Sequence, residues 1–233
     1  MYVTDPLDDP APHQTFNGCL STINITFESV CKLVSSLDAE ASMGPDEIHP
    51  KLIRSCNALV YPLYLLFRKS LQCGKLPSQW KESLVTPLFK KGSRYVSLNY
   101  RPISLTSVCC KTLEREIACK LYEYLESNSL ISENQFGFRK GRSVEDQLLL
   151  TYNSVSLWYD QGFLVDLVLF DFTKAFDVVP HSLLLKKLEL LGICGTLLSW
   201  LEDFLVGRVM SVSVSGSRSY SREVLSGVPR EVS

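Results

Sequence analysis

Hydrophobic residues recur at intervals of three and four positions along much of the chain. This spacing places them on one face of an α-helix. In the stretch from 24 to 37, the hydrophobic positions are Ile25, Phe27, Val30, Leu33, Val34 and Leu37. The chain pattern predicts helices over residues 24–37, 50–57, 60–73, 107–126, 144–160, 181–191 and 196–205. Gly74 and Gly192 each follow such a stretch, and glycine commonly ends a helix at that place.

Strand patterns occur in two parts of the chain that flank the long helices. Residues 82–89 (ESLVTPLF) predict a short strand. Pro87 within it indicates an edge or a bulge, because proline has no N–H for a strand ladder. Residues 210–214 alternate with serine, and residues 220–225 can pair with them across a turn at Gly216. Helices and strands together predict an α+β fold.

Composition places the chain among folded proteins. It has 233 residues and 26.3 kDa, with 45% hydrophobic and 21% charged residues, which is unlike a disordered or fibrous chain. No apolar run reaches the roughly 18 residues typical of a membrane span. The longest, residues 163–172, is interrupted by Asp166 and Asp171. The N-terminal residues lack the features of a signal peptide, so we expect a cytosolic or nuclear protein without a membrane partner.

Eight cysteines are spread along the chain, and no two have the C-x-x-C spacing. Only three histidines accompany them, so the sequence does not predict a zinc site. A disulfide scaffold is not expected either, at this length and without a secretory signal. The cysteines are therefore predicted to be buried free thiols.

The net charge of −1 hides an uneven distribution. Residues 1–50 hold one basic and eight acidic residues, a net charge of −7. Residues 51–142 hold sixteen basic and six acidic residues, a net charge of +10, and residues 143–233 have a net charge of −4. A basic middle suits a polyanion such as nucleic acid or a nucleotide. The alternative is a lysine-rich solvated surface without a partner.

Asp171 is a candidate metal ligand because of its place in the sequence. Residues 164–170 form an apolar run that predicts a buried strand, and it leads directly into Asp171. A carboxylate at the end of a buried strand needs a partner, and a divalent metal such as Mg²⁺ would supply one. The alternative is an aspartate that caps the next helix, which the spacing alone favours.

Several motifs follow one another in the order found in one protein family. They are Ser42-x-Gly44-Pro45-Asp46, Leu76-Pro77-x-x-Trp80-Lys81, Val85-x-Pro87, Lys90-Lys91-Gly92, residues 99–105 (NYRPISL), Lys111-x-x-Glu114, residues 135–143 (QFGFRKGRS), residues 170–177 (FDFTKAFD), His181 with Leu184-Leu185 and Lys187-Leu188, and residues 226–229 (SGVP). Over about residues 42 to 229 the chain resembles the reverse transcriptase domain of a non-LTR (LINE-type) retrotransposon.

The resemblance implies a right-hand polymerase made of fingers and a partial palm, with an incomplete antiparallel palm sheet. Residues 42–160 would form the fingers and residues 161–229 the partial palm. Residues 1–41 match only a variable connector, and residues 230–233 are a divergent terminus. The implied reaction is RNA-templated DNA synthesis, in which two Mg²⁺ ions assist the attack of a primer 3′-OH on a dNTP. RNA template, DNA primer and dNTP are the implied partners.

The resemblance also implies roles for individual residues of the palm. Asp171 matches the first catalytic, metal-binding aspartate, and Phe172 the position where the backbone approaches the metal and the triphosphate. Phe176 matches the aromatic residue that packs under the sugar and excludes a ribose 2′-OH. Gly227 lies in the loop that shapes the nucleotide pocket. Core packing for the two phenylalanines and an ordinary turn for Gly227 are the alternatives.

Five cations of the fingers are further candidates. Arg101 and Lys91 match a region that contacts the incoming triphosphate or the template, and a guanidinium can bind phosphate in a bidentate manner. Lys90, Arg139 and Arg142 are candidate contacts to nucleic acid, the two arginines on template phosphates. The alternative for each is a solvated surface cation.

Two departures from the family concern activity. Pro229 is followed by residues 230–233 (REVS), where the family continues with Gln-Gly. The family's later aromatic-x-Asp-Asp motif supplies the remaining metal carboxylates, and no Asp-Asp pair occurs here after Pro10. One carboxylate cannot hold two Mg²⁺ ions, so we expect no polymerisation by this chain alone. The alternatives are a non-catalytic RNA- or DNA-binding remnant and a chain without molecular function.

Overall fold

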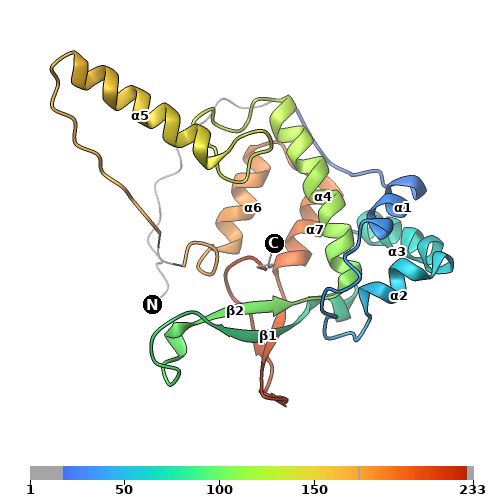
Figure 1. The fold of residues 1–233 in the computed structure, drawn as a ribbon. Coiled ribbons are helices and arrows are strands. Elements are labelled where there is room, and N and C mark those ends of the chain that lie inside the picture. Colours follow the sequence, from blue (N-terminus) through green and yellow to red (C-terminus); the bar gives the residue numbers. More distant parts are fainter. Residues whose placement is uncertain (1–17, 173, 230–233) are drawn as a thin grey trace. The chain divides into compact units, whose positions relative to one another are not determined.

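A computed structural model describes residues 18–172 and 174–229 of the chain (Figure 1). The divergent terminus at 230–233 and the first part of the N-terminal connector therefore lie outside the described residues. The chain divides into two compact units. The first unit comprises Met1–Leu121 with Ala175–Ser233, and the second comprises Tyr122–Lys174.

The helices of the first unit lie where the hydrophobic spacing predicts them. They are α1 (Phe27–Ser35), α2 (Pro50–Ser55), α3 (Val60–Cys73), the first part of α4 (Val108–Ser127), α6 (His181–Leu190) and α7 (Gly195–Leu205). Three 3₁₀ turns accompany them, at Asn57–Leu59, Ser78–Lys81 and Ser97–Asn99. Thr26 caps α1 by accepting a hydrogen bond from the Ser29 amide, and Gly74 ends α3 in the left-handed conformation at φ 60°.

The core of the first unit lies among α1, α3, α4 and α7. Helix α3 packs against both α1 and α7, and α6 packs against α7. Phe67 of α3 and Trp200 of α7 are both fully buried, and Phe67 meets Trp80 edge to face at 6.0 Å. The indole N–H of Trp200 donates to the buried Ser70 hydroxyl at 2.9 Å, so the one polar atom of this large side chain is satisfied.

Asp203 fastens α7 to the segment that leads into the first strand. Its carboxylate accepts a hydrogen bond from the Leu76 amide at 2.8 Å and lies 3.0 Å from the ammonium groups of both Lys75 and Lys81. Burial by itself raises the pKa of Asp203, but the amide and the two lysines together hold the pKa below its ordinary value. The ionised form of Asp203 therefore stabilises this contact.

The sheet of the first unit is mixed, in the order β2-β1-β3-β4. Its strands are β1 (Glu82–Phe89), β2 (Tyr100–Leu105), β3 (Val209–Val214), β4 (Ser217–Arg218) and β5 (Arg222–Glu223). Strand β1 is antiparallel to β2 and parallel to β3, and both β4 and β5 pair with β3 in the antiparallel direction. The strands within residues 161–229, which are β3, β4 and β5, pair in the antiparallel direction, and the one parallel pair joins β3 to β1 outside that range. The hairpin expected across Gly216 is present, shared between β4 and β5.

Pro87 lies in the half of β1 that has a paired strand on one side only. Strand β1 pairs with β3 only over Glu82–Val85, so its second half is a sheet edge on that side. On the other side Pro87 stands opposite Pro102 of β2. The sequence-based expectation of an edge is thus confirmed for the half of β1 that contains Pro87.

The cysteines are only partly free thiols. Cys109 and Cys110 of α4 are buried as predicted, and burial raises the pKa of Cys109 to about 11. Burial also raises the pKa of Cys110, whose thiol donates to Glu114 at 3.0 Å. Cys73 and Cys119 are exposed, which the prediction of buried thiols did not anticipate.

A disulfide joins Cys19 to Cys194, which corrects the expectation that all cysteines are free. The two residues are 175 positions apart in sequence. They meet because Leu20 forms a parallel bridge with Ile193, and its amide donates to the Gly192 carbonyl at 2.8 Å. This pairing depends on the folded chain and has no signature in the cysteine spacing.

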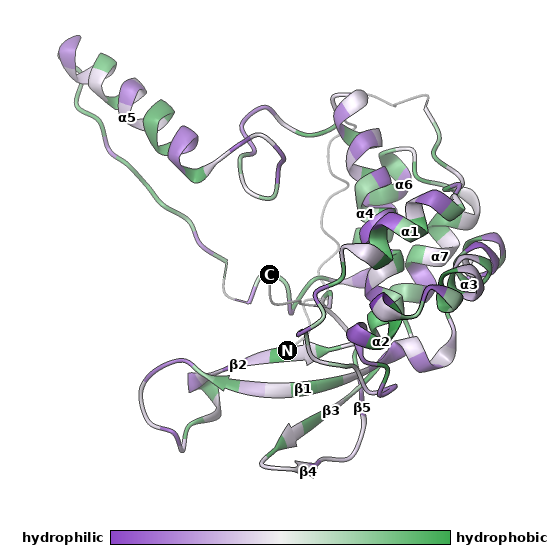
Figure 2. Cartoon of the chain, turned by 45° about the vertical axis from the view of Figure 1, so that its right-hand side comes forward, coloured by the Kyte–Doolittle hydropathy of each residue, from purple (hydrophilic) through white to green (hydrophobic). Residues whose placement is uncertain are grey.

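The second unit contains the end of α4, a loop, helix α5 (Val144–Asp160) and the segment that follows it. Helix α5 has the predicted bounds and begins with a capping box formed by Ser143 and Asp146. None of its residues is buried, although hydrophobic residues recur along it (Figure 2). Within the described residues, no helix has the length and apolar character needed to cross a membrane.

The buried strand expected over residues 164–170 is wrong. These residues form no strand, and most of their hydrophobic side chains are exposed, including Phe170 at 90%. A strand needs a neighbouring strand that pairs with its backbone N–H and C=O groups. The described residues of the second unit contain no strand that could be this neighbour. Asp171 is consequently exposed, so the argument that a buried carboxylate requires a metal does not apply to it.

Candidate functional site

The loop at residues 226–229 is docked on the turn that contains Phe176. The Gly227 amide donates to the Val179 carbonyl at 2.9 Å, and the Val228 amide donates to the Phe176 carbonyl at 3.0 Å. The Ser226 hydroxyl donates to the Asp177 carbonyl at 3.1 Å. Two sequence motifs about fifty positions apart are thereby brought into direct contact.

His181 adds a fourth contact to this loop. Its Nε2 lies 2.7 Å from the Gly227 carbonyl oxygen, and it donates the hydrogen bond because a carbonyl can only accept. His181 begins α6, so the loop is also fixed to the first residue of a helix. Phe176, one of the predicted nucleotide-binding residues, is half-buried in the turn on which this loop is docked.

Gly227 is required at its position for two reasons. Its φ of 85° lies in the left-handed region that residues with a Cβ adopt at a cost. A Cβ built on it would also lie 2.8 Å from the carbonyl oxygens of both Phe176 and Asp177. These are backbone atoms of the docked turn, so the loop would have to move away. Close backbone contact, rather than the turn alone, therefore explains the glycine.

The hairpin of β1 and β2 carries three of the predicted cations, Lys90, Lys91 and Arg101. Its tip is braced by Asn99: the Lys90 amide donates to the Asn99 carbonyl at 2.8 Å, and Asn99 Nδ2 donates to the Ser93 carbonyl at 2.9 Å. Gly92 has a φ of 89°, and a Cβ there would lie 2.7 Å from Asn99 Nδ2. The loop therefore has a defined conformation on a two-stranded base.

Aromatic side chains support the base of this loop. Phe89 and Tyr100 face each other in register, with ring centroids 5.4 Å apart. Arg94 lies over the Phe89 ring at 5.3 Å, and the Tyr100 hydroxyl donates to the Arg94 carbonyl at 2.9 Å. These contacts hold Arg94 above the end of the strands while its guanidinium remains exposed.

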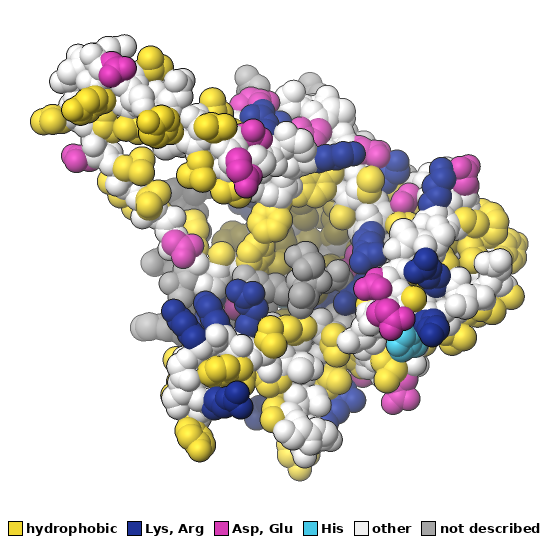
Figure 3. Space-filling model, viewed as in Figure 1, with side chains coloured by type: hydrophobic (Ala, Val, Ile, Leu, Met, Phe, Trp, Pro, Cys, Tyr) yellow, Lys and Arg dark blue, Asp and Glu magenta, His cyan; other side chains and the backbone are white. Residues whose placement is uncertain are grey.

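The hairpin is strongly cationic. Lys90, Lys91, Arg94 and Arg101 are all exposed, and none forms an ion pair with a carboxylate of the described chain. No acidic residue occurs between Ser83 and Leu113 in the sequence. Lys and Arg side chains gather around the tip of the hairpin in the space-filling view (Figure 3). The hairpin can therefore attract a polyanion without competition from nearby carboxylates.

The other two predicted cations, Arg139 and Arg142, are engaged within the second unit. The Arg139 guanidinium donates to both carboxylate oxygens of Glu126, at 2.8 and 3.0 Å, and to the Ser132 carbonyl at 2.8 Å. Glu133 contacts both arginines, and Arg142 also lies over the Phe136 ring at 5.1 Å. Only 8% of the Arg139 side chain is exposed.

These ion pairs change the protonation equilibria of their members. The hydrogen bond from Arg139 lowers the pKa of Glu126, and the same bond raises the pKa of Arg139. The Tyr122 hydroxyl also donates to the Phe138 carbonyl and closes the loop onto the end of α4. The contacts of Arg139 and Arg142 hold the loop together. Their role on template phosphates stays a prediction.

Asp171 and Phe172 lie on the exposed segment after α5, and Phe172 is 83% exposed. Within the described chain, no three His, Cys, Asp or Glu side chains gather where they could share a metal ion. The residues present therefore do not fit the carboxylate set that two Mg²⁺ ions require. The assignment of Asp171 as a metal ligand continues to rest on the sequence resemblance.

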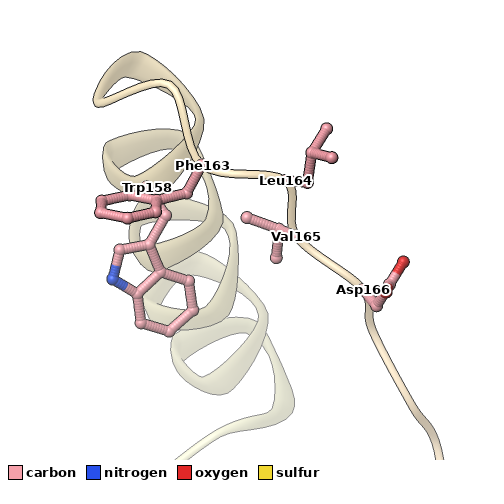
Figure 4. A pocket seen from close by; sticks show the side chains of 5 residues that line it. All are labelled: Trp158, Phe163, Leu164, Val165 and Asp166. Carbon is pink, nitrogen blue, oxygen red and sulfur yellow. The ribbon is translucent and has the colours of Figure 1, made fainter.

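An open pocket of about 390 Å³ lies in the second unit. Trp158 at the end of α5 lines it, together with Phe163 and the next three residues (Figure 4). Leu164, Val165 and Asp166 extend along the segment away from the helix (Figure 4). None of the predicted site residues lines this pocket, so it is not a candidate for the chemistry inferred from the motifs.

Two residues of the hairpin, Arg94 and Tyr95, belong to no predicted motif, and Asn99 was predicted only as the first residue of the motif at 99–105. Arg94 and Tyr95 stand within the acid-free stretch, and that charge pattern was a signal that could have identified them. The Asn99 side chain donates to the Ser93 carbonyl, six positions away, and the motif at 99–105 does not include Ser93. Its role is visible only in the folded hairpin.

The chain is similar to known proteins of one kind. The family described as reverse transcriptase (RNA-dependent DNA polymerase) matches residues 89–230. A probable RNA-directed DNA polymerase from transposon BS of Drosophila melanogaster is 31% identical over 88% of the chain and 23% of its own length. The RNA-directed DNA polymerase from mobile element jockey of Drosophila funebris is 30% identical over 99% of the chain and 25% of its own length. The chain thus spans about a quarter of these relatives.

Proposed function

Because this chain belongs to the reverse transcriptase family, among the enzymes of non-LTR retrotransposons, we propose that it is a fragment of an RNA-directed DNA polymerase. The observation that carries the proposal is the docking of residues 226–229 on the turn at Phe176. Both motifs are assigned to the nucleotide pocket by resemblance, and a shared pocket requires them to be adjacent. The exposed cations of the β1–β2 hairpin support the same function.

The proposal divides the chain into the parts of a right-hand polymerase. Residues 42–160 are the fingers and residues 161–229 are the partial palm. In this arrangement the RNA template, DNA primer and dNTP are the partners of the intact enzyme. The mixed sheet and the helices are compatible with such a fragment.

The proposed roles of individual residues follow the motif matches, residue by residue. Asp171 is the proposed catalytic carboxylate, with Phe172 beside it at the triphosphate. Phe176 sits under the sugar, and Gly227 allows the loop to approach the turn that carries Phe176. Lys91, Arg101 and Lys90 offer their charges from the hairpin.

We further propose that the chain by itself does not extend a primer. The sequence offers Asp171 but no later Asp-Asp pair, so the carboxylates for two Mg²⁺ ions are incomplete. The test is primer extension on an RNA template with dNTPs and Mg²⁺, using the purified chain and its Asp171→Ala variant. Equal, background-level extension by both is expected. Extension by the unaltered chain above the variant would refute the proposed inactivity.

A second candidate function is non-catalytic binding of RNA or DNA. The observation that favours it is the hairpin, whose four cations are exposed and without acidic partners in the described chain. Binding should weaken as salt rises, because cations that contact phosphates release counterions. Arg101→Ala should reduce both the affinity and the slope of log Kd against log salt. Arg139→Ala should weaken binding less, because Arg139 is already held by Glu126. Binding unchanged by both Arg101→Ala and Arg139→Ala would count against this function.

A further inference from the structure

Tyr95 stands at the tip of the β1–β2 hairpin and is 99% exposed. Its backbone amide donates to the Ser93 hydroxyl at 3.3 Å, so its backbone is held while its ring extends into solvent. An aromatic ring left fully in water gives up the burial that such a side chain contributes to folding. Its ring is therefore accessible to a ligand.

The turn that carries Tyr95 is supported from both sides. On one side Arg94 is fixed by the Tyr100 hydroxyl and lies over Phe89. On the other side the Val96 amide donates to the Ser93 carbonyl at 3.3 Å, and the same carbonyl accepts from Asn99. A ligand that contacts Tyr95 would meet a loop that is already shaped, which lowers the entropic cost of binding.

The charges around Tyr95 favour an anionic ligand. Lys90, Lys91 and Arg94 precede it within five positions, all exposed and none paired with a carboxylate of the described chain. An exposed aromatic ring beside several cations is the combination that binds single-stranded nucleic acid. The cations follow the phosphates, and the ring stacks on a base of any sequence. A base inside a duplex has neighbours on both faces, so only an unpaired base can stack on Tyr95.

We propose that Tyr95 is a stacking platform for an unpaired base of single-stranded RNA or DNA, with Lys90, Lys91 and Arg94 on the adjacent phosphates. This proposal rests on the proposed function, because it names the partner of the same hairpin. It adds a residue that contributes through its ring, whereas the cations contribute through charge. The two contributions are separable by experiment.

The test compares Tyr95→Ala, Tyr95→Phe and Leu98→Ala in the full chain. Leu98 is the matched control, since it is an apolar side chain of the same loop and is 78% exposed. The probes are 12-nucleotide single strands of RNA and of DNA that contain 2-aminopurine, and the corresponding duplexes. The fluorescence of 2-aminopurine falls when the base stacks, so it reports the ring contact directly.

Tyr95→Ala should weaken single-strand binding by about 5- to 150-fold, the range that loss of one base–aromatic stack gives. It should also abolish the quenching of 2-aminopurine. Tyr95→Phe should keep both affinity and quenching, and Leu98→Ala should bind normally. The slope of log Kd against log salt should stay unchanged in Tyr95→Ala, whereas Lys91→Ala should reduce it by about 0.7. The loss of affinity in Tyr95→Ala should be similar for RNA and DNA single strands. Binding of the duplexes should leave the fluorescence of 2-aminopurine unchanged.

Three results would overturn the stacking proposal. The first is wild-type affinity and quenching in Tyr95→Ala. The second is an equal loss in Leu98→Ala, which would show general apolar contact. The third is quenching that persists in Tyr95→Ala while Lys91→Ala abolishes binding, which would leave the proposed nucleic-acid function intact and remove only Tyr95. Absence of any binding by the unaltered chain at low salt would overturn both.

Discussion

Replacement of Gly227 by alanine tests the contact on which the proposed nucleotide pocket rests. The added Cβ would lie 2.8 Å from the carbonyl oxygens of Phe176 and Asp177. Both oxygens belong to the backbone, so relief requires the loop at 226–229 to move off the turn. The variant should therefore fold with this loop detached.

The cost has two parts. A residue with a Cβ in the left-handed region loses about 1–2 kcal/mol. Detachment also removes the three hydrogen bonds that the loop donates to the turn, each worth about 0.5–1.5 kcal/mol, or about 1.5–4.5 kcal/mol together. A matched control is available in Gly216, which has a similar φ of 81° but no atom within 4 Å of its Cβ position. Gly216→Ala should show only the cost of the left-handed conformation, about 1–2 kcal/mol.

The assay is native-state hydrogen exchange at the amides of residues 227 and 228. In Gly227→Ala these amides should exchange about 10- to 2000-fold faster than in the unaltered chain, which corresponds to the loss of the hydrogen bonds. Gly216→Ala should leave their exchange unchanged. Protection in Gly227→Ala within threefold of the unaltered chain would refute the reasoning, because the loop would then tolerate the clash in place.

Three further predictions concern stability and reactivity. Asp203→Asn should lower the free energy of unfolding by about 1–3 kcal/mol in urea titrations at pH 7. Because the pKa of Asp203 is depressed in the folded chain, its contribution is present above the unfolded pKa and is lost as pH falls, so the variant should lose less stability in acid. Cys109 and Cys110 should resist a thiol reagent at pH 8 until the chain unfolds, since burial raises both pKa values. Their contribution to stability should decline as pH rises above about 9, and prompt labelling would contradict their burial. Arg139→Lys should increase protease cleavage within residues 132–142, because lysine cannot reproduce the two-point contact with Glu126.

The helices were predictable because their signals are local. Residues 144–160 are predicted and observed as α5 with the same bounds. The capping box joins Ser143 to Asp146, only three positions later, so the sequence contains the complete start signal. The stop of α3 at Gly74 is local in the same way.

The failures concern contacts between distant residues. An apolar run such as residues 164–170 predicts a strand only if a partner strand is available, and the run itself carries no information about that partner. The disulfide of Cys19 and Cys194 depends on the bridge between Leu20 and Ile193.

The motifs predicted individual residues of the candidate site, and they did not predict the contacts between those residues. The motifs identified Phe176 and Gly227, but their contact across some fifty positions is visible only after folding. The sequence likewise showed Arg139 as a cation and not as the partner of Glu126, thirteen positions earlier. Tyr95 is a single residue between motifs, and its meaning comes from its exposure and from the shape of the hairpin.

The proposal that this chain binds nucleic acid at the β1–β2 hairpin is tested most directly by photo-crosslinking. A single-stranded RNA that contains 4-thiouridine is crosslinked to the full chain at low salt, and the crosslinked peptides are then mapped. The account predicts crosslinks to residues between Phe89 and Arg101, lost when Lys90, Lys91 and Arg94 are all replaced by alanine. Crosslinks confined to other segments, or unchanged in that triple variant, would contradict it.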